Sequence, residues 1–165
     1  MKHNSQHDKR VYLTAEGLHD LKAEYEKLTR EDRPKVADRI ARAREFGDLS
    51  ENAEYDAARE QQSFIEGRII ELEEILKHAQ VIENRKSKVN IVEVGSTVTV
   101  EIDGEKENYT IVGSVEAQPE QGRISHESPV GKALLGLKVG DEVDVDLPHA
   151  KLKYRIIQIH SGASN

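Results

Sequence analysis

The sequence predicts an α+β protein in which an N-terminal antiparallel α-helical coiled-coil hairpin precedes a small β-sheet domain with one short helix. Two observations lead to this prediction. Apolar residues recur at steps of three and four over residues 14–80, the spacing of a coiled-coil seam. From about residue 95 they alternate, which is typical of half-buried strands. The composition, 36% hydrophobic and 33% charged, favours a thin helical hairpin over one thick core.

The hairpin is expected to have two long arms. Thr14 is a favourable N-cap for the first arm, and Glu16 suits its first turn. Pro34 interrupts the first seam because proline cannot donate a backbone hydrogen bond, and the seam then resumes out of step. The second seam runs almost without a break. The predicted seam residues are Leu18, Leu21, Tyr25, Leu28, Val36, Ile40 and Ala43, followed by Tyr55, Ala58, Gln62, Ile65, Ile69, Leu72, Leu76 and Ala79.

The connection between the arms, residues 46–52, carries two acids three residues apart. Gly47 suits the left-handed position that ends a helix. Asp48 is a good N-cap for the second arm, and Glu51 at its N3 position completes a pattern that resembles a capping box. So short a connection forces the arms to run antiparallel. In this interpretation the two acids only stabilise a helix end.

A second interpretation of Asp48 and Glu51 is functional. Mg²⁺ commonly takes one or two carboxylates, and water and substrate phosphates complete its shell. Two carboxylates at the end of a rod therefore suit a site whose other ligands belong to a partner. Such a site would position a metal and an attacking water for phosphodiester hydrolysis. The capping and metal interpretations are compatible, and the residues alone leave both open.

The second half predicts strands joined by recognisable turns. Asp103-Gly104 is a strong hairpin signal, and Pro129 suits the first position of a short helix. We expect strands near residues 97–102, 109–112, 143–145 and 154–157, with the helix at 128–135. The predicted layout is an N-terminal extension (1–10), the hairpin (11–80), a linker (81–94), the sheet domain (95–160) and a tail (161–165).

Composition excludes several classes of function. A net charge of −7, from 24 basic and 31 acidic residues, argues against a broad duplex-binding surface. The chain has no cysteine, which excludes disulfides, zinc ribbons and thiol catalysis. No histidine pair has metal-site spacing, and Gly131-Lys132-Ala133 lacks the glycine and hydroxyl of a phosphate-binding loop. Without a signal peptide or membrane-spanning run, the expectation is a cytoplasmic protein with no membrane partner.

Several motifs stand in a fixed order across both halves of the chain. The most specific is AREFGDLSENAEY at residues 43–55, continuing as AAREQQ at 57–62. Supporting segments are LTAEG (13–17), RP (33–34), EGRI (66–69), YTIVG (109–113) and SPVGKALLG (128–136). Together, from about Val11 to Ile159, they resemble the Gre family of bacterial transcript cleavage factors.

The resemblance implies a factor that acts through RNA polymerase. The coiled coil would enter the polymerase secondary channel in backtracked complexes, and an FKBP-like C-terminal domain would dock at the channel rim. Asp48 and Glu51 would help the polymerase active site to hold its second Mg²⁺ and activate water. The factor itself would then be neither the nuclease nor the owner of a cofactor. Its implied polymerase-docking residues are Ser128, Pro129, Ala133, Leu134, Leu135 and Gly136.

Other residues of the resemblance are less decisive. Arg44 and Arg59 match basic positions associated with the extruded RNA 3′ end, although helix-surface ion pairs would explain them equally well. Leu134 and Leu135 can also pack the short helix on the sheet, and at least one is expected to do so. Ser50 stands where some members have Lys, and Pro148-His149-Ala150 replaces a glycine-containing turn.

Four hypotheses remain at this stage. The chain is a monomeric cleavage-stimulating factor, or a same-fold secondary-channel binder that inhibits the polymerase. It is otherwise an independent chaperone or isomerase using the C-terminal domain, or a structural coiled-coil adaptor that does not need its tip acids. Family relatives with altered tips inhibit the polymerase, so the intact Asp48 and Glu51 favour the cleavage factor.

Overall fold

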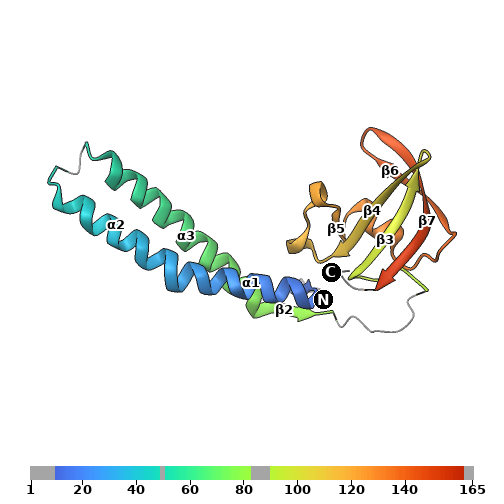
Figure 1. The fold of residues 1–165 in the computed structure, drawn as a ribbon, viewed down its shortest axis with the longest axis horizontal. Helices are drawn as coiled ribbons and strands as arrows, with labels where there is room; N and C mark the ends of the chain where they lie inside the picture. The colour runs from blue at the N-terminus through green and yellow to red at the C-terminus, as the bar shows by residue number, and fades with distance from the viewer. Residues whose placement is uncertain (1–9, 49–50, 83–89, 162–165) are drawn as a thin grey trace, which may run out of the picture. The chain divides into compact units, whose positions relative to one another are not determined.

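The computed structural model describes residues 10–48, 51–82 and 90–161. The chain forms two compact units (Figure 1). One unit is the helical hairpin of residues 18–78, and the other is a sheet domain that takes in the chain up to Gly17 together with residues from Ala79 onward. The predicted fold class is confirmed. The predicted layout stays a prediction, and most of its extension, linker centre and tail lie outside the described residues.

The hairpin has one interrupted arm and one continuous arm. The first arm consists of α1 (Ala15–Lys27), the π-helical turn η1 (Leu28–Asp32) and α2 (Arg33–Glu45). The second is α3 (Ala53–His78), which at 26 residues is about 40 Å long. Arg68 of the second arm bonds Glu24 of the first, whereas Glu54 of the second arm bonds Arg39 of the first. Residue numbers therefore increase along one arm in the direction in which they decrease along the other. The arms are therefore antiparallel, as predicted.

The π-helical turn explains why the first seam changes step. The Arg33 N–H donates to the Leu28 carbonyl, five residues back, instead of to the residue four back. Pro34 follows directly and has no N–H to give to the preceding turn. One extra residue in the turn moves the apolar stripe on by one position. Accordingly Val36, Ile40 and Ala43 are buried, which confirms the predicted shift.

The second seam is confirmed with one correction near its end. Ala58, Ile65, Ile69 and Leu72 are buried as predicted, but Ile75 is buried in place of Leu76, which is half-buried. Ala79 does not continue the helix. It begins β2 (Ala79–Val81), which pairs in parallel with β1 (Val11–Leu13). Both strands have three residues, too few for a period of two to reveal them.

Polar contacts between the arms follow the seam on its outer edges. Arg33 donates to Glu66 at 2.8 and 2.5 Å, and Arg68 donates to Glu24 at 2.7 and 2.9 Å. The Tyr25 hydroxyl donates to Glu73 at 2.9 Å, and this bond raises the pKa of the phenol. These side chains are at least partly exposed, so each contributes little stability. They follow from the register of the arms, which the buried apolar seam sets.

The sheet has the strand order β5-β4-β3-β7-β6 and is antiparallel except where β4 meets β5. Asp103 and Gly104 both have positive φ, 52° and 86°, the turn that an Asp-Gly hairpin needs. The predicted strands and helix are confirmed, whereas β5 was not predicted. The elements are β3 (Ser96–Ile102), β4 (Glu105–Val112), β5 (Arg123–Ser125), α4 (Pro129–Leu134), β6 (Glu142–Leu147) and β7 (Ala150–Ser161).

The core of the sheet domain lies on one face of this sheet. Alternate residues of β3, such as Val98 and Val100, point into it and are fully buried. Ile111 of β4 and Ile156 of β7 join them, and Leu134 of α4 covers the cluster with no exposed surface. The sheet is thus closed on one side by the short helix that the sequence predicted.

A buried carboxylate attaches the N-terminal segment to the sheet domain. Glu116, whose side chain is 3% exposed, accepts hydrogen bonds from the Thr14 N–H at 2.8 Å and from the Thr14 hydroxyl at 2.5 Å. It also accepts from the Gly113 N–H at 3.3 Å and pairs with Arg123 at 3.2 Å. The Thr14 hydroxyl in turn accepts from the Gly17 N–H at 3.0 Å, which confirms Thr14 as the N-cap of α1.

Two glycines make this close approach possible. A Cβ atom on Gly17 would lie 2.1 Å from Oε1 of Glu116. A Cβ atom on Gly113 would lie 1.9 Å from the Tyr12 carbonyl oxygen in β1. Neither distance is possible between real atoms. The segment from Tyr12 to Gly17 therefore packs against the loop after β4 only because both positions lack a side chain.

Replacing Gly17 with Ala should destabilise the sheet domain. The new methyl group would displace a carboxylate that is buried and held by several donors, at a cost of about 1–3 kcal/mol. Gly67→Ala is the matched control, because its Cβ meets nothing within 4 Å in α3. That change should instead stabilise by up to about 1 kcal/mol. Urea unfolding followed by circular dichroism measures both, and equal shifts in the two variants would contradict the close approach.

Candidate functional site at the hairpin tip

The first arm ends as the sequence predicted. Phe46 is the C-cap of α2, and Gly47 follows in the left-handed region with φ of +98°. The Phe46 N–H donates to the Ala43 carbonyl and the Gly47 N–H to the Arg44 carbonyl, both at 3.3 Å. Gly47 therefore terminates α2, and the chain turns away from the helix axis before Asp48.

The start of the second arm differs from the prediction. Asn52, not Asp48, is the N-cap of α3, because its Oδ1 accepts from the Tyr55 N–H at 3.1 Å and Ala53 is the first helical residue. Glu51 precedes the cap instead of occupying N3, so the predicted capping box is wrong. The physical reason is a second bond. The Asn52 Nδ2 donates to the Ala43 carbonyl at 2.9 Å, and a carboxylate has no such donor.

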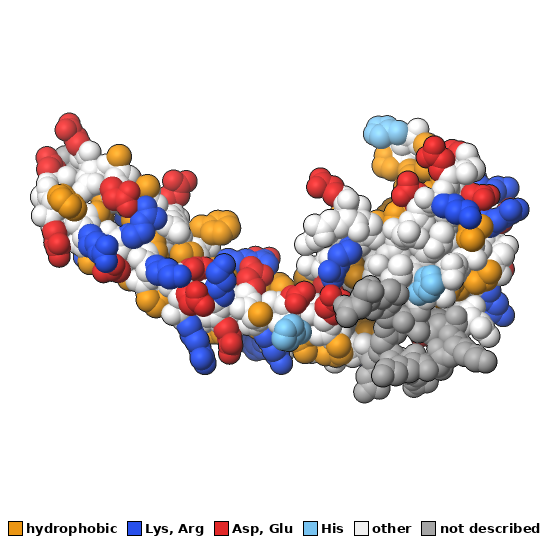
Figure 2. Space-filling view, viewed as in Figure 1, with side chains coloured by type: hydrophobic (Ala, Val, Ile, Leu, Met, Phe, Trp, Pro, Cys, Tyr) orange, Lys and Arg blue, Asp and Glu red, His pale blue; other side chains and the backbone are white. Residues whose placement is uncertain are grey.

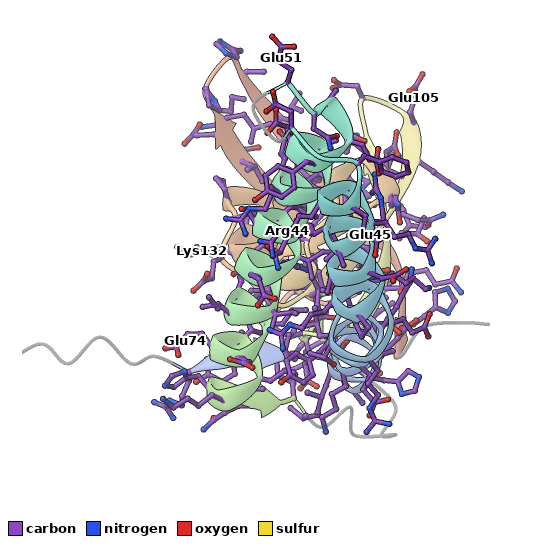
Figure 3. The ribbon with its side chains drawn as sticks, turned by 90° about the vertical axis from the view of Figure 1, so that its left-hand side faces the viewer. Arg44, Glu45, Glu51, Glu74, Glu105 and Lys132 are labelled. Atoms are coloured by element: carbon purple, nitrogen blue, oxygen red, sulfur yellow. The ribbon has the colours of Figure 1, made fainter. Side chains whose placement is uncertain are left out.

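The two acids are consequently left outside both helices. Asp48 and Glu51 are exposed, and the Glu51 side chain points away from the arms (Figure 3). Acidic side chains surround this end of the hairpin unit in the space-filling view (Figure 2). Nearby Glu54 bonds Arg39 at 2.7 and 3.0 Å and is thus occupied by an inter-arm contact. Ser50, noted above as a departure, lies outside the described residues.

The two arginines singled out from the sequence lie on the two arms near the tip. Arg44 in α2 lies over the ring of Tyr55, with 5.9 Å between its guanidinium carbon and the ring centroid. Arg59 in α3 donates to the Gln62 side chain at 2.9 Å. Both are exposed. Arg44 thus contacts an aromatic ring and Arg59 an amide.

The chemistry of the tip fits a partial metal site. Carboxylate oxygens are ligands that Mg²⁺ prefers, and it often takes only one or two from a protein. Across residues 10–48, 51–82 and 90–161, no group of three His, Cys, Asp or Glu side chains could hold a metal ion together. Asp48 and Glu51 alone would offer such an ion two carboxylates, fewer ligands than its shell needs.

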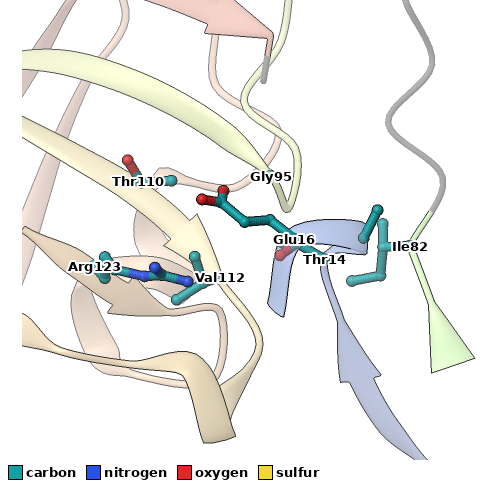
Figure 4. Close-up of a pocket in the computed structure, with 8 residues that line it drawn as sticks. Thr14, Glu16, Ile82, Gly95, Thr110, Val112 and Arg123 are labelled. Atoms are coloured by element: carbon teal, nitrogen blue, oxygen red, sulfur yellow. The ribbon is translucent and has the colours of Figure 1, made fainter. Parts of the chain in front are cut away.

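A pocket in the sheet domain is the main alternative to the tip. It has a volume of about 380 Å³ and includes Glu16, Thr110 and Arg123 in its wall (Figure 4). Arg123 is already paired with Glu116, and its buried Nε has no hydrogen-bond partner among the described residues. The lining residues include no histidine, no cysteine and only one carboxylate. They offer no nucleophile with an adjacent base, so the tip is the stronger candidate.

The residues expected to dock on a polymerase come together around α4. Ser128 caps this helix, accepting from the Gly131 N–H at 3.0 Å and donating to the Ser125 carbonyl at 2.7 Å. Pro129 and Gly136 are exposed, whereas Ala133 and Leu135 are half-buried. Leu134 is fully buried in the core, so its side chain is not offered at the surface. This confirms that one of the two leucines packs the helix.

None of the described helices is both long enough and apolar enough to cross a membrane.

Comparisons with known proteins cover nearly the whole chain. Residues 11–81 match the family "Transcription elongation factor, N-terminal", and residues 86–161 match "Transcription elongation factor, GreA/GreB, C-term". Transcription elongation factor GreA of Thermomicrobium roseum is 54% identical over 151 residues, covering 91% of this chain and 97% of that protein. The protein of the same name from Acetivibrio thermocellus is 50% identical over 155 residues, covering 92% and 97%.

Among solved structures, the GreA factor homolog 1 (Gfh1) protein of Thermus thermophilus is 33% identical, with a TM-score of 0.43 and coverage of 92% of this chain and 99% of that one. The sequence matches span both the hairpin and the sheet domain, in the order that the motifs indicated. The chain therefore belongs to the GreA/GreB family of transcription elongation factors.

Proposed function

We propose that this chain stimulates RNA cleavage by backtracked RNA polymerase, by inserting the hairpin tip into the secondary channel. The observation that carries the proposal is the placement of Asp48 and Glu51. Both acids are exposed in the connection between two antiparallel helices, and Asn52, not either acid, is the N-cap of α3. Both therefore lie outside the helices, at the end of the hairpin that a second molecule can reach first.

The chain's own residues would contribute ligands, not a complete active site. Asp48 and Glu51 would offer carboxylate oxygens to Mg²⁺ shared with the polymerase. When bound, that ion would supply a charge that stabilises the reacting phosphate and a water of lowered pKa. The phosphodiester bond would be cut in the polymerase active site, and the factor would need no cofactor of its own. Arg44 and Arg59 would lie beside the extruded RNA 3′ end.

The length of the second arm supports delivery at a distance. Glu51 precedes the first turn of α3, so roughly 40 Å of helix separates it from His78. Such a rod reaches into a channel that a compact domain cannot enter. The buried cluster that includes Val36, Ile40 and Ile69 holds the two arms together, and Arg39 still meets Glu54 close to the tip.

Removing the tip charges should abolish stimulation without unfolding the protein. We expect the double variant Asp48→Asn, Glu51→Gln to bind polymerase like the intact protein and to reduce stimulated cleavage at least about 100-fold, as for the loss of essential electrostatic groups. Because Asn52 caps α3, the variant should keep its helix content. The measurement is RNA cleavage in an artificially backtracked complex at low Mg²⁺, with binding followed by competition.

The same assay separates the alternatives. If the double variant cleaves as fast as the intact protein, the metal-delivery role is wrong. If neither protein speeds cleavage but both bind, the chain is a secondary-channel inhibitor on the same scaffold.

A separate prediction concerns docking through α4. Pro129 is exposed at the start of this helix, where a glutamate is tolerated because the helix N-terminus favours negative charge. Pro129→Glu should therefore leave the fold intact and weaken polymerase binding by about tenfold, the effect of roughly 1.4 kcal/mol. Val139→Glu is the control, since Val139 is 57% exposed and is not among the expected docking residues. Unchanged binding of both variants would place the docking surface elsewhere.

A further inference from the structure

A single side chain joins the two helix ends at the tip. The Asn52 amide accepts from the Tyr55 N–H in the first turn of α3 and donates to the Ala43 carbonyl in the last turn of α2. We infer that Asn52 is a positioning residue, which fixes the acid-bearing connection in addition to capping α3. The inference rests on the proposed function, because the atoms to be positioned are the carboxylates of Asp48 and Glu51.

The bond to Ala43 is well placed to hold the connection. The Ala43 carbonyl accepts a long bond of 3.3 Å from the Phe46 N–H, and its second lone pair can take the Asn52 amide. Ala43 itself is only 2% exposed, and Asn52 is half-buried. Water therefore competes less for this bond than it would at a fully exposed loop. The bond crosses from one arm to the other within the hairpin unit.

The consequence is a fixed distance between the end of α2 and the start of α3. The Asn52 amide bonds Ala43 in the last turn of α2 and the first turn of α3. Glu51 is adjacent to the held residue, and Asp48 follows Gly47, whose left-handed backbone sets the direction of exit from α2. Fixing ligand groups before binding removes the entropy cost of ordering them later. Misplacement by about 1 Å can lower a rate about 100-fold.

An amide suits this position better than the other good N-cap residues. Aspartate keeps the acceptor for the Tyr55 N–H but would turn a second oxygen toward the Ala43 carbonyl. Serine also keeps a capping oxygen, yet it is shorter and has one polar atom in place of two on separate branches. Asn52→Ser therefore retains the cap and loses the bond between the arms. Asn52→Ala loses both.

The experiment compares the intact protein with Asn52→Ser and Asn52→Ala, using the full chain. Melting temperature and helix content report capping, and ¹⁵N relaxation of the Asp48 and Glu51 amides in the free protein reports how firmly the connection is held. Cleavage in a backtracked polymerase complex is titrated with Mg²⁺, and polymerase binding is measured by competition. The double variant Asp48→Asn, Glu51→Gln is included as the reference for complete loss.

For Asn52→Ser we expect a melting temperature and polymerase binding close to those of the intact protein. Its Glu51 amide should be more mobile, stimulated cleavage should fall about 10- to 100-fold, and half-maximal cleavage should need more Mg²⁺. If Asn52→Ser matches the intact protein in both relaxation and cleavage while Asn52→Ala only melts earlier, Asn52 is a helix cap and the inference is wrong.

The two proposals fail separately in this design. If the intact protein does not stimulate cleavage, the proposed function is wrong, and the relaxation data alone then decide whether Asn52 holds the connection. Unchanged relaxation in Asn52→Ser would overturn the positioning role in that case too. If the intact protein stimulates cleavage and Asn52→Ser is equally active, only the positioning role is overturned.

Discussion

The apolar seam between the two arms is the contact on which the position of the tip depends. Val36 and Ile40 of α2 pack with Ala58, Ile65 and Ile69 of α3 in one buried cluster. Most helix stability in proteins comes from packing of an apolar face, so each arm is stabilised mainly by the other. The surrounding ion pairs are exposed and add little. The fully buried seam residues nearest the tip are Ala43 and Ala58, and both acids lie beyond them along the hairpin.

The sheet domain depends on a different kind of contact, a buried charge whose hydrogen bonds are satisfied. A carboxylate that loses water is costly unless several donors replace it. Glu116 meets that condition with the backbone and hydroxyl of Thr14, the backbone of Gly113 and the guanidinium of Arg123. The absence of side chains at Gly17 and Gly113 is what lets these groups approach. This satisfied charge fixes the N-terminal segment on the sheet domain, where apolar burial alone would leave its register less specified.

Sequence reasoning succeeded where the signal is periodic or local and failed where it depends on distant partners. The seam predicted both arms, and Asp103-Gly104 predicted its hairpin. The cap of α3 was misassigned because Asp48 and Asn52 have similar capping preference, and only the nearness of the Ala43 carbonyl distinguishes them. The role of Glu116 left no local signal, since its partner Thr14 is 102 residues away. The exposed tip position of both acids, by contrast, followed from the shortness of their connection.

At the tip, Asn52 caps α3 while Asp48 and Glu51 do not, and this affects what the two acids can do. A carboxylate that caps a helix shares its two oxygens between backbone N–H groups and any cation that it binds, so the geometry of each interaction constrains the other. The neutral amide of Asn52 removes that constraint from α3, because its bonds to Tyr55 and Ala43 use neither acid. The helix end and the ligand pair then become independent features of the same connection. Two exposed acids can therefore lie at the tip without lowering the stability of α3.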